Sequence, residues 1–167
     1  KEVVAPVLKE IVGKSGTLEF DINIFHPHYE DVVMYKTYIS IERDGEEVWY
    51  GRVISISKDF YNTKTVICEG DLGLLNDSIQ VSYGYSGTVR GYIDYILGNH
   101  NSQVEEEKRI YTGNIVVSDS NDYIHRENSS YKKTLEELDA KLTKLLGGYL
   151  KTRHENGVIF LDYIWNY

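Results

Sequence analysis

Two histidines one residue apart are the side chains best suited to metal binding. His26 and His28 flank Pro27, and Glu30 and Asp31 follow closely. Imidazole and carboxylate groups suit zinc or nickel. The segment lacks a third ligand at a firm spacing, however, and Pro27 holds it extended. We therefore expect an exposed loop here and no metal site.

A third histidine, His100, stands between Asn99 and Asn101 at the end of a predicted helix. A helix C-terminus favours the protonated ring, so a structural capping role fits this position. A catalytic base would need a nucleophile beside it, and the sequence signals none. The chain also lacks G-x-S-x-G, H-E-x-x-H, P-loop and dinucleotide-binding motifs. We therefore expect no catalytic, cofactor-binding or metal-binding residues and no cofactor.

Carboxylates are abundant, but they say little about chemistry. A glycosidase needs only two of them in the right geometry, so their presence is uninformative. The run Glu105–Glu107 is typical of a solvated acidic loop, and Glu136 and Glu137 are expected on the outer face of a helix. Residues 119–122 (DSND) lack the spacing of a calcium-binding loop. This lack of catalytic signals favours a structural or binding role.

Charge and composition bear on the class of partner. The net charge of −8 argues against a nucleic-acid groove, because phosphate binding needs a basic patch. The pair Lys132–Lys133 is expected on a solvated helix face. The single cysteine, Cys68, excludes an internal disulfide and is expected to be a buried, inert thiol. A content of 15 Tyr against 4 Phe favours a Tyr-rich β surface for protein contacts over a dedicated ligand platform.

Sequence signals for membrane insertion and export are lacking. The chain has no apolar run of about 18 residues, so we expect no transmembrane helix. It also has no recognisable signal peptide. It begins at Lys1 and stops within the strand-like run 157–167. We expect both ends to be cuts in a longer protein.

The elements that position these residues begin with a β-rich block. Alternating apolar residues predict strands at 17–24, 35–43, 48–57 and 64–70. Asp44-Gly45 is a hairpin signal. Gly51 interrupts one alternation and indicates a bulge or a close backbone approach. Residues 71–77 (DLGLLND) predict a short helical turn.

The second block mixes helices and strands. Thr88 is expected to cap a helix that ends near residues 98–101, and residues 134–137 have capping-box spacing. Gly147-Gly148 is the expected stop of the second helix. Strands are predicted at 109–118, 149–154 and 157–164, whereas residues 121–130 are polar without a clear pattern. The apolar stripe of the second helix consists of Leu135, Leu138, Leu142 and Leu145.

The predicted fold class is therefore α+β and mainly antiparallel β. Residues 82–87 (SYGYSG) are the best candidate for a boundary. We expect a small N-terminal β-barrel over 1–82 and an α+β domain with two amphipathic helices over 83–167, truncated at its C-terminus.

An ordered set of phrases resembles the N-terminal hub region of the tail-associated lysin, or prophage endopeptidase tail, family. The resemblance covers nearly all of the chain in order. The phrases that carry it are Leu18–Val32, Ile41–Val53, Cys68–Ser78, His100–Val117, Leu145–Leu150 followed by Arg153, and Leu161–Tyr163.

The resemblance implies a phage or prophage structural protein in the virion tail, made in the bacterial cytoplasm. It is similar to the baseplate hub of contractile-tailed phages: a β-barrel that forms a homotrimer around the tail axis, with a distal tail protein and a tape-measure protein as partners. It implies no specific nucleic-acid binding. In the family, a C-terminal region outside this stretch often carries peptidoglycan-cleaving or receptor-binding activity. The resemblance therefore assigns no catalytic residues here, and this fragment is expected not to be an enzyme.

Two other functions stay open at this point. One is a peptidoglycan endopeptidase or glycosidase whose site is hidden among the carboxylates and His100. The other is a carbohydrate-binding module that attaches to the host cell wall through exposed Tyr residues, Trp49 or Trp165. Trp49 is more simply explained as a sheet residue, and Trp165 as a residue that packs in a truncated domain.

Overall fold

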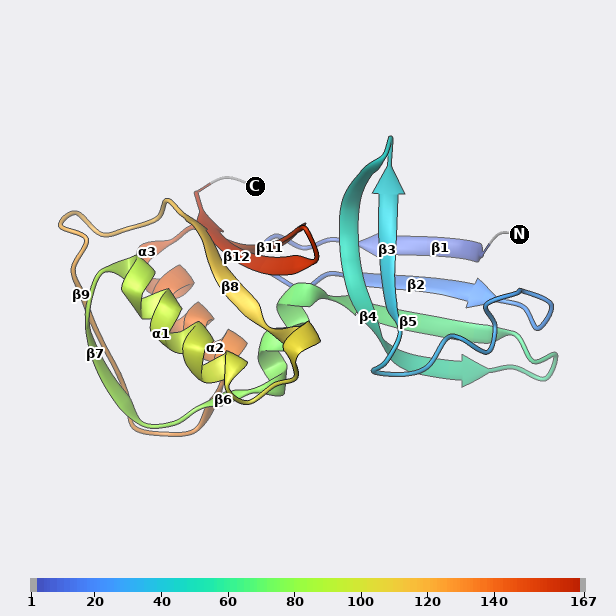
Figure 1. The fold of residues 1–167 in the computed structure, drawn as a ribbon, viewed down its shortest axis with the longest axis horizontal. Helices are drawn as coiled ribbons and strands as arrows, with labels where there is room; N and C mark the ends of the chain where they lie inside the picture. Colours follow the sequence, from blue (N-terminus) through green and yellow to red (C-terminus); the bar gives the residue numbers. More distant parts are fainter. Residues whose placement is uncertain (1–2, 166–167) are drawn as a thin grey trace. The chain divides into compact units, whose positions relative to one another are not determined.

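The computed structural model describes residues 3–165 and divides the chain into two compact units (Figure 1). The first unit holds the described residues up to Ile11 together with Ser15–Asp71, and the second holds Val12–Lys14 and the described residues from Leu72 onward. Residues 72–82, which the sequence analysis assigns to the first domain, thus lie in the second unit. The two ends of the chain, expected to be cuts, lie outside the described residues.

The first unit is a five-stranded antiparallel sheet with the strand order β1-β2-β5-β4-β3. The alternation in the sequence is confirmed in β2, where Leu18, Phe20 and Ile22 are buried. The strands are β1 (Val4–Lys9), β2 (Thr17–Ile22), β3 (Tyr38–Arg43), β4 (Glu46–Lys58) and β5 (Lys64–Gly70).

This sheet is a curled half-barrel, so the prediction of a closed barrel is wrong. Among residues 3–165, β1 and β3 each pair with one strand only and form the two edges. The curl comes from the long strand β4, whose first half pairs with β3 and whose second half pairs with β5. Tyr29 and Val32, in the loop after β2, pack into the core of this sheet, so the core is covered without a further strand.

Gly51 marks a close backbone approach in β4, as its place in the sequence indicates. A Cβ atom at this position would collide with the carbonyl oxygen of Glu69 and with the ring of Trp49. Register shifts lie on both sides, at Ile41/Glu42 in the pairing with β3 and at Val53/Ser55 in the pairing with β5. The glycine therefore lets the Trp49 ring fold back onto the strand that carries it.

The second unit is an α+β arrangement with three small sheets. In one, β11 pairs antiparallel with β12, which pairs parallel with β8; the other two pair β7 with β9 and β6 with β10. The elements are η1 (Asp71–Asp77, whose first residue belongs to the first unit), β6 (Ile79–Gln80), β7 (Tyr83–Gly87), α1 (Val89–Asn101), η2 (Glu106–Lys108), β8 (Ile110–Ile115), β9 (Ile124–Asn128), β10 (Lys132–Lys133), α2 (Thr134–Leu138), η3 (Asp139–Thr143), α3 (Lys144–Leu146), β11 (Tyr149–Glu155) and β12 (Val158–Ile164).

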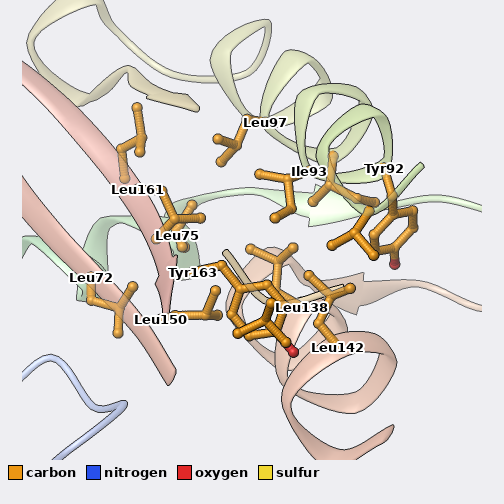
Figure 2. Close-up of a cluster of buried hydrophobic side chains, with 14 of the residues drawn as sticks. Leu72, Leu75, Tyr92, Ile93, Leu97, Leu138, Leu142, Leu150, Leu161 and Tyr163 are labelled. Carbon is orange, nitrogen blue, oxygen red and sulfur yellow. The ribbon is translucent and has the colours of Figure 1, made fainter. Parts of the chain in front are cut away.

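The core of the second unit is one cluster of buried side chains drawn from helices and strands (Figure 2). Ile93 and Leu97 of α1 meet Leu138 of α2 and Leu161 of β12 in this cluster. The start of α1 is confirmed, because the Thr88 hydroxyl accepts a hydrogen bond from the Gly91 amide at 3.0 Å.

The expected boundary at residues 82–87 is a strand instead. Tyr83–Gly87 forms β7, and it pairs residue by residue with β9, in the stretch where the sequence shows no clear pattern. Its Gly and Ser residues are typical of a loop. Its partner, β9, lies about forty residues further along the chain, so the local composition of β7 cannot indicate that the two strands pair.

The second predicted helix also differs in its details. Its middle section, η3, is π-helical, and the extra residue shifts the inward face by one position. Leu142 is buried, but Leu145 is 60% exposed and Leu146 packs against the core in its place. The expected stop is confirmed, because Gly147 and Gly148 both have positive φ.

Candidate functional site

The loop with two histidines is exposed and internally bonded. The His28 Nδ1 atom lies 2.8 Å from the Asp31 carboxylate, and the His28 amide donates to His26 Nδ1 at 3.2 Å. Tyr29 anchors the loop by donating its hydroxyl proton to the Asn62 carbonyl oxygen at 2.6 Å. Within residues 3–165, no three His, Cys, Asp or Glu side chains are grouped in a way that could hold a metal ion.

His100 lies at the centre of a buried polar cluster, which we call the His100 network: Ser78, Gln80, His100 and Thr134. Ser78 Oγ lies 2.6 Å from both His100 Nδ1 and Thr134 Oγ1. Gln80 Nε2 donates to Thr134 Oγ1 at 2.8 Å. The network thereby joins Ser78, which lies between η1 and β6, to β6, α1 and α2 in the second unit. All four residues are buried.

The hydrogen bonds of this network have one consistent direction when the His100 ring is neutral. The Lys108 carbonyl oxygen can only accept, so His100 Nε2 carries a proton and donates to it at 3.1 Å. In the neutral ring Nδ1 then accepts from Ser78, Ser78 accepts from Thr134, and Thr134 accepts from Gln80 Nε2.

Burial, rather than helix capping, sets the protonation of His100. Removal from water lowers the pKa of the imidazole, and this outweighs the hydrogen bond to Lys108 and the nearby Asp77, which raise it. The expectation of a charged ring at a helix end is therefore wrong. Ser78 stands beside His100 as a nucleophile would, but Ser78 is 2% exposed and His100 is 0% exposed. In this conformation the pair joins elements together and has no access to substrate.

One buried carboxylate, Glu137, was placed wrongly by sequence reasoning. Glu137 is buried in α2, although the pattern predicts an outward position. The Tyr83 hydroxyl donates to its Oε1 atom at 2.6 Å and lies 2.6 Å from the Tyr92 hydroxyl. Its Oε2 atom has no hydrogen-bond partner among residues 3–165. Burial and this carboxylate raise the pKa of Tyr83.

The capping-box prediction fails for a related reason. Lys133 is the N-cap of α2 and makes no side-chain capping bond, and Thr134 is already inside the helix. The Thr134 hydroxyl instead belongs to the His100 network. Lys132 and Lys133 form the short strand β10 rather than the start of a helix.

The remaining candidate residues hold structural positions. Cys68 is buried in β5, and burial raises the pKa of its thiol to about 12, as expected for an inert cysteine. Glu105–Glu107 are exposed, and Glu105 pairs with Lys108 at 2.9 Å. Trp49 is buried in β4, whereas Trp165 is partly exposed.

Two kinds of surface remain as sites for contact with other molecules. One is the edge of the first unit's sheet at β3, which pairs with β4 alone among the strands of residues 3–165. The other is the aromatic tip, which consists of Phe25, Phe60 and Tyr61 on two loops of the same unit. Phe25 is 93% and Phe60 92% exposed. The hydrogen bond between Tyr29 and Asn62 joins the two loops that carry these residues, and the rings of Phe60 and Tyr61 contact each other.

Two solved structures have the same fold as this chain. One is the prophage tail protein gp18 from Listeria monocytogenes EGD-e, with a TM-score of 0.58 and 16% identity over 93% of this chain and 43% of that one. The other is the 43 kDa tail protein of prophage MuSo2 from Shewanella oneidensis, with a TM-score of 0.51 and 18% identity over 94% of this chain and 47% of that one. The chain thus spans less than half the length of either protein. No protein-family model and no curated protein sequence matches it.

Proposed function

We propose that this chain is a structural component of a phage or prophage tail tip, in the baseplate hub that connects the tail tube to the host-facing end. The observation that carries the proposal is the fold that it shares, along nearly its whole length, with two prophage tail proteins. The ordered phrases that resemble the hub region of the tail-associated lysin family support the same role. The protein would then reside in the virion tail.

In this role, copies of the chain assemble around the tail axis as a homotrimer in the full-length protein. The distal tail protein and the tape-measure protein are its neighbours. Curled sheets with free edges suit such assembly, because edges and side faces are available to other chains. The net charge of −8 supports passage of DNA without binding, since like charges repel. In the described residues, no helix is long and apolar enough to cross a membrane.

We further propose that this stretch binds and supports rather than catalyses. Among residues 3–165, two Ser–His pairs lie within hydrogen-bond distance: Ser78 with His100, which are buried, and Ser86 with His125, which are exposed. The competing function is a peptidoglycan endopeptidase. Purified chain incubated with cell walls should release no fragments above background. Release that disappears in His100→Asn or in His125→Asn, with the fold retained, would favour the enzyme.

The aromatic tip favours one further candidate, a module that binds cell-wall carbohydrate. Exposed aromatic rings on fixed loops can stack on sugars at low entropic cost. Binding to purified cell-wall polysaccharide that is lost in Phe60→Ser but kept in Tyr131→Ser would support this candidate. Tyr131 is the matched control, because it is also an exposed aromatic residue but lies in the second unit.

Deletion of the gene tests the proposed function. Induced cells that lack it should release heads without finished tails, and a copy supplied in trans should restore complete particles. Complete, infectious particles from the deletion strain would contradict the structural role. Particles that look complete but do not infect would favour host attachment instead.

A further inference from the structure

The turn between β11 and β12 joins an asparagine to a glycine in an exposed loop. Asn156 and Gly157 are both exposed, and their φ angles of 52° and 78° are typical of the tight turn that asparagine followed by glycine favours. A Cβ atom built at Gly157 would meet nothing within 4 Å. The loop therefore has open space around it and room to change shape.

The backbone amide of Gly157 is in a position to act as a nucleophile. The ladder of β11 and β12 ends with the pair Glu155 and Val158, so the Gly157 amide takes no part in it. Among residues 3–165, this amide makes no hydrogen bond in a turn or loop either. Glycine also has no side chain that would hinder an attack by its own nitrogen.

Asn62 resembles Asn156 in conformation, but the peptide bond that follows it is held at both ends. Asn62 is exposed and has a φ of 61°. The Thr63 amide donates to the Asp59 carboxylate at 2.8 Å, and the Asn62 carbonyl oxygen accepts from the Tyr29 hydroxyl at 2.6 Å. Thr63 is also β-branched, which crowds its nitrogen. Asn62 is therefore an internal comparison in which the following amide is not free to move.

We propose that Asn156 is a site of spontaneous deamidation, which converts its side-chain amide into a carboxylate. The Gly157 nitrogen loses its proton to a base in solution and attacks the Asn156 Cγ atom. The Cγ–Nδ2 bond then breaks, ammonia leaves, and a cyclic succinimide remains. The attack is intramolecular, so it avoids the entropic cost of bringing two molecules together. Asn156 is the one asparagine of the chain that precedes a glycine.

Water then opens the ring at either of its two carbonyl carbons. Attack at Cγ gives aspartate, whereas attack at the main-chain carbonyl carbon gives isoaspartate, whose main chain runs through Cβ and Cγ. One water molecule is consumed and one ammonia is released in total, and nothing is oxidised or reduced. Both products add one negative charge to the turn, beside the Glu155 carboxylate that pairs with Arg153 at 2.6 Å.

Isoaspartate is the product that changes the shape of the hairpin. It adds one atom to the backbone of a tight loop, and a turn of this kind has to match the twist of both strands. The pair Glu155 and Val158 should then separate, while Ile159, which is buried in the core, should hold the rest of β12 in place. This modification does not depend on the proposed role in a phage tail.

Ageing of the folded chain tests the proposal. The chain is kept for days in mildly alkaline buffer, in parallel with the same chain in urea, and is then digested with trypsin. Cuts after Lys58, Lys64 and Arg153 place Asn62 and Asn156 in separate peptides, and mass spectrometric fragmentation locates the converted residue. In the folded chain, Asn156 should convert at least about tenfold faster than Asn62, because attack depends steeply on how closely the nitrogen approaches Cγ.

Three results would overturn the proposal. Conversion of Asn156 in urea alone would show that the folded turn protects it, and the other two are equal rates at Asn62 and Asn156 or no conversion at either.

Asn156→Gly is the matched variant, because glycine accepts the same φ but has no amide to lose. On anion exchange, the aged wild-type chain should gain a more acidic species, and the aged variant should elute like fresh protein. An acidic species of equal abundance in the variant would place the reaction at another residue and overturn the assignment.

Discussion

His100 has both ring nitrogens in fixed roles, and this makes it sensitive to acid. Protonation of Nδ1 would turn it into a donor toward Ser78 and would reverse the bond between Ser78 and Thr134, so that the Thr134 hydroxyl accepts from both Ser78 and Gln80 and its own proton loses Ser78 as acceptor. Burial lowers the pKa of His100 in the folded chain from its ordinary value of 6.5. At pH values between 6.5 and the lower pKa of the folded chain, the unfolded chain binds more protons than the folded chain.

The free energy of unfolding should therefore be highest above pH 6.5 and fall as the pH drops below it. In His100→Asn, the loss of the network bonds should cost about 1–3 kcal/mol near pH 8. The same variant should show a smaller further loss on acidification, because the titrating group is gone. Urea denaturation at several pH values measures both effects.

His125 is the matched control for this prediction. Its Nδ1 atom lies 2.7 Å from Ser86 Oγ, so it resembles the His100 pair, but it is exposed. His125→Asn should keep the wild-type dependence on pH. An acid response that persists in His100→Asn and disappears in His125→Asn would contradict the role given to the buried network.

Tyr83 has a comparable role toward the buried Glu137 carboxylate. Tyr83→Phe removes the hydroxyl that donates to Glu137 Oε1 and should lower the free energy of unfolding by about 1–3 kcal/mol. Tyr85→Phe removes an exposed bond to the Thr88 carbonyl oxygen and should cost less than about 0.5 kcal/mol. Similar losses in the two variants, measured by denaturation, would argue against a stabilising contact at Glu137.

At the scale of the elements, the π-helical section η3 decides which leucines enter the core. Leu142→Ala should cost about 2–5 kcal/mol, since this side chain is fully buried. Leu145→Ala should cost less than about 0.5 kcal/mol, because the shift leaves it exposed. A continuous α-helix would make both substitutions costly, so thermal denaturation of the two variants distinguishes the helix types.

Local pattern predicted the elements whose side chains follow one simple rule. Strand β5 and the turn η1 have the bounds expected from alternation and from DLGLLND, and Thr88 caps α1 as expected. The short strands β6 and β10 and the Gly-rich β7 were missed, because only partners distant in the chain stabilise them. The open sheet was mistaken for a barrel, since no local signal shows that Tyr29 and Val32 cover the core.

The polar network was beyond local pattern for the same reason. Ser78 and Thr134 are 56 residues apart, and neither carries a motif. Glu137 looks like a surface residue on a regular helix, and only the fold brings the Tyr83 hydroxyl to it. The sequence offered only the positions of two residues as a signal. Ser78 directly follows DLGLLND, and Thr134 directly precedes the leucine stripe of the second helix.

At the scale of the whole molecule, the acidic charge should prevent DNA binding. The chain has 26 Asp and Glu residues against 18 Lys and Arg residues. It should cause no shift of duplex DNA in gels at about 0.1 M salt, because its net charge is negative and the protein does not displace condensed counterions from DNA. A shift that weakens steeply with added salt would reveal a basic patch and contradict a passive channel wall.

The most direct test of a tail-tip role is the position of the protein in assembled particles. Antibodies raised against this chain and marked with gold should bind at the tail end distal to the head in electron micrographs of induced phage particles. Label on the head, along the tail sheath, or only on material free of particles would contradict the account.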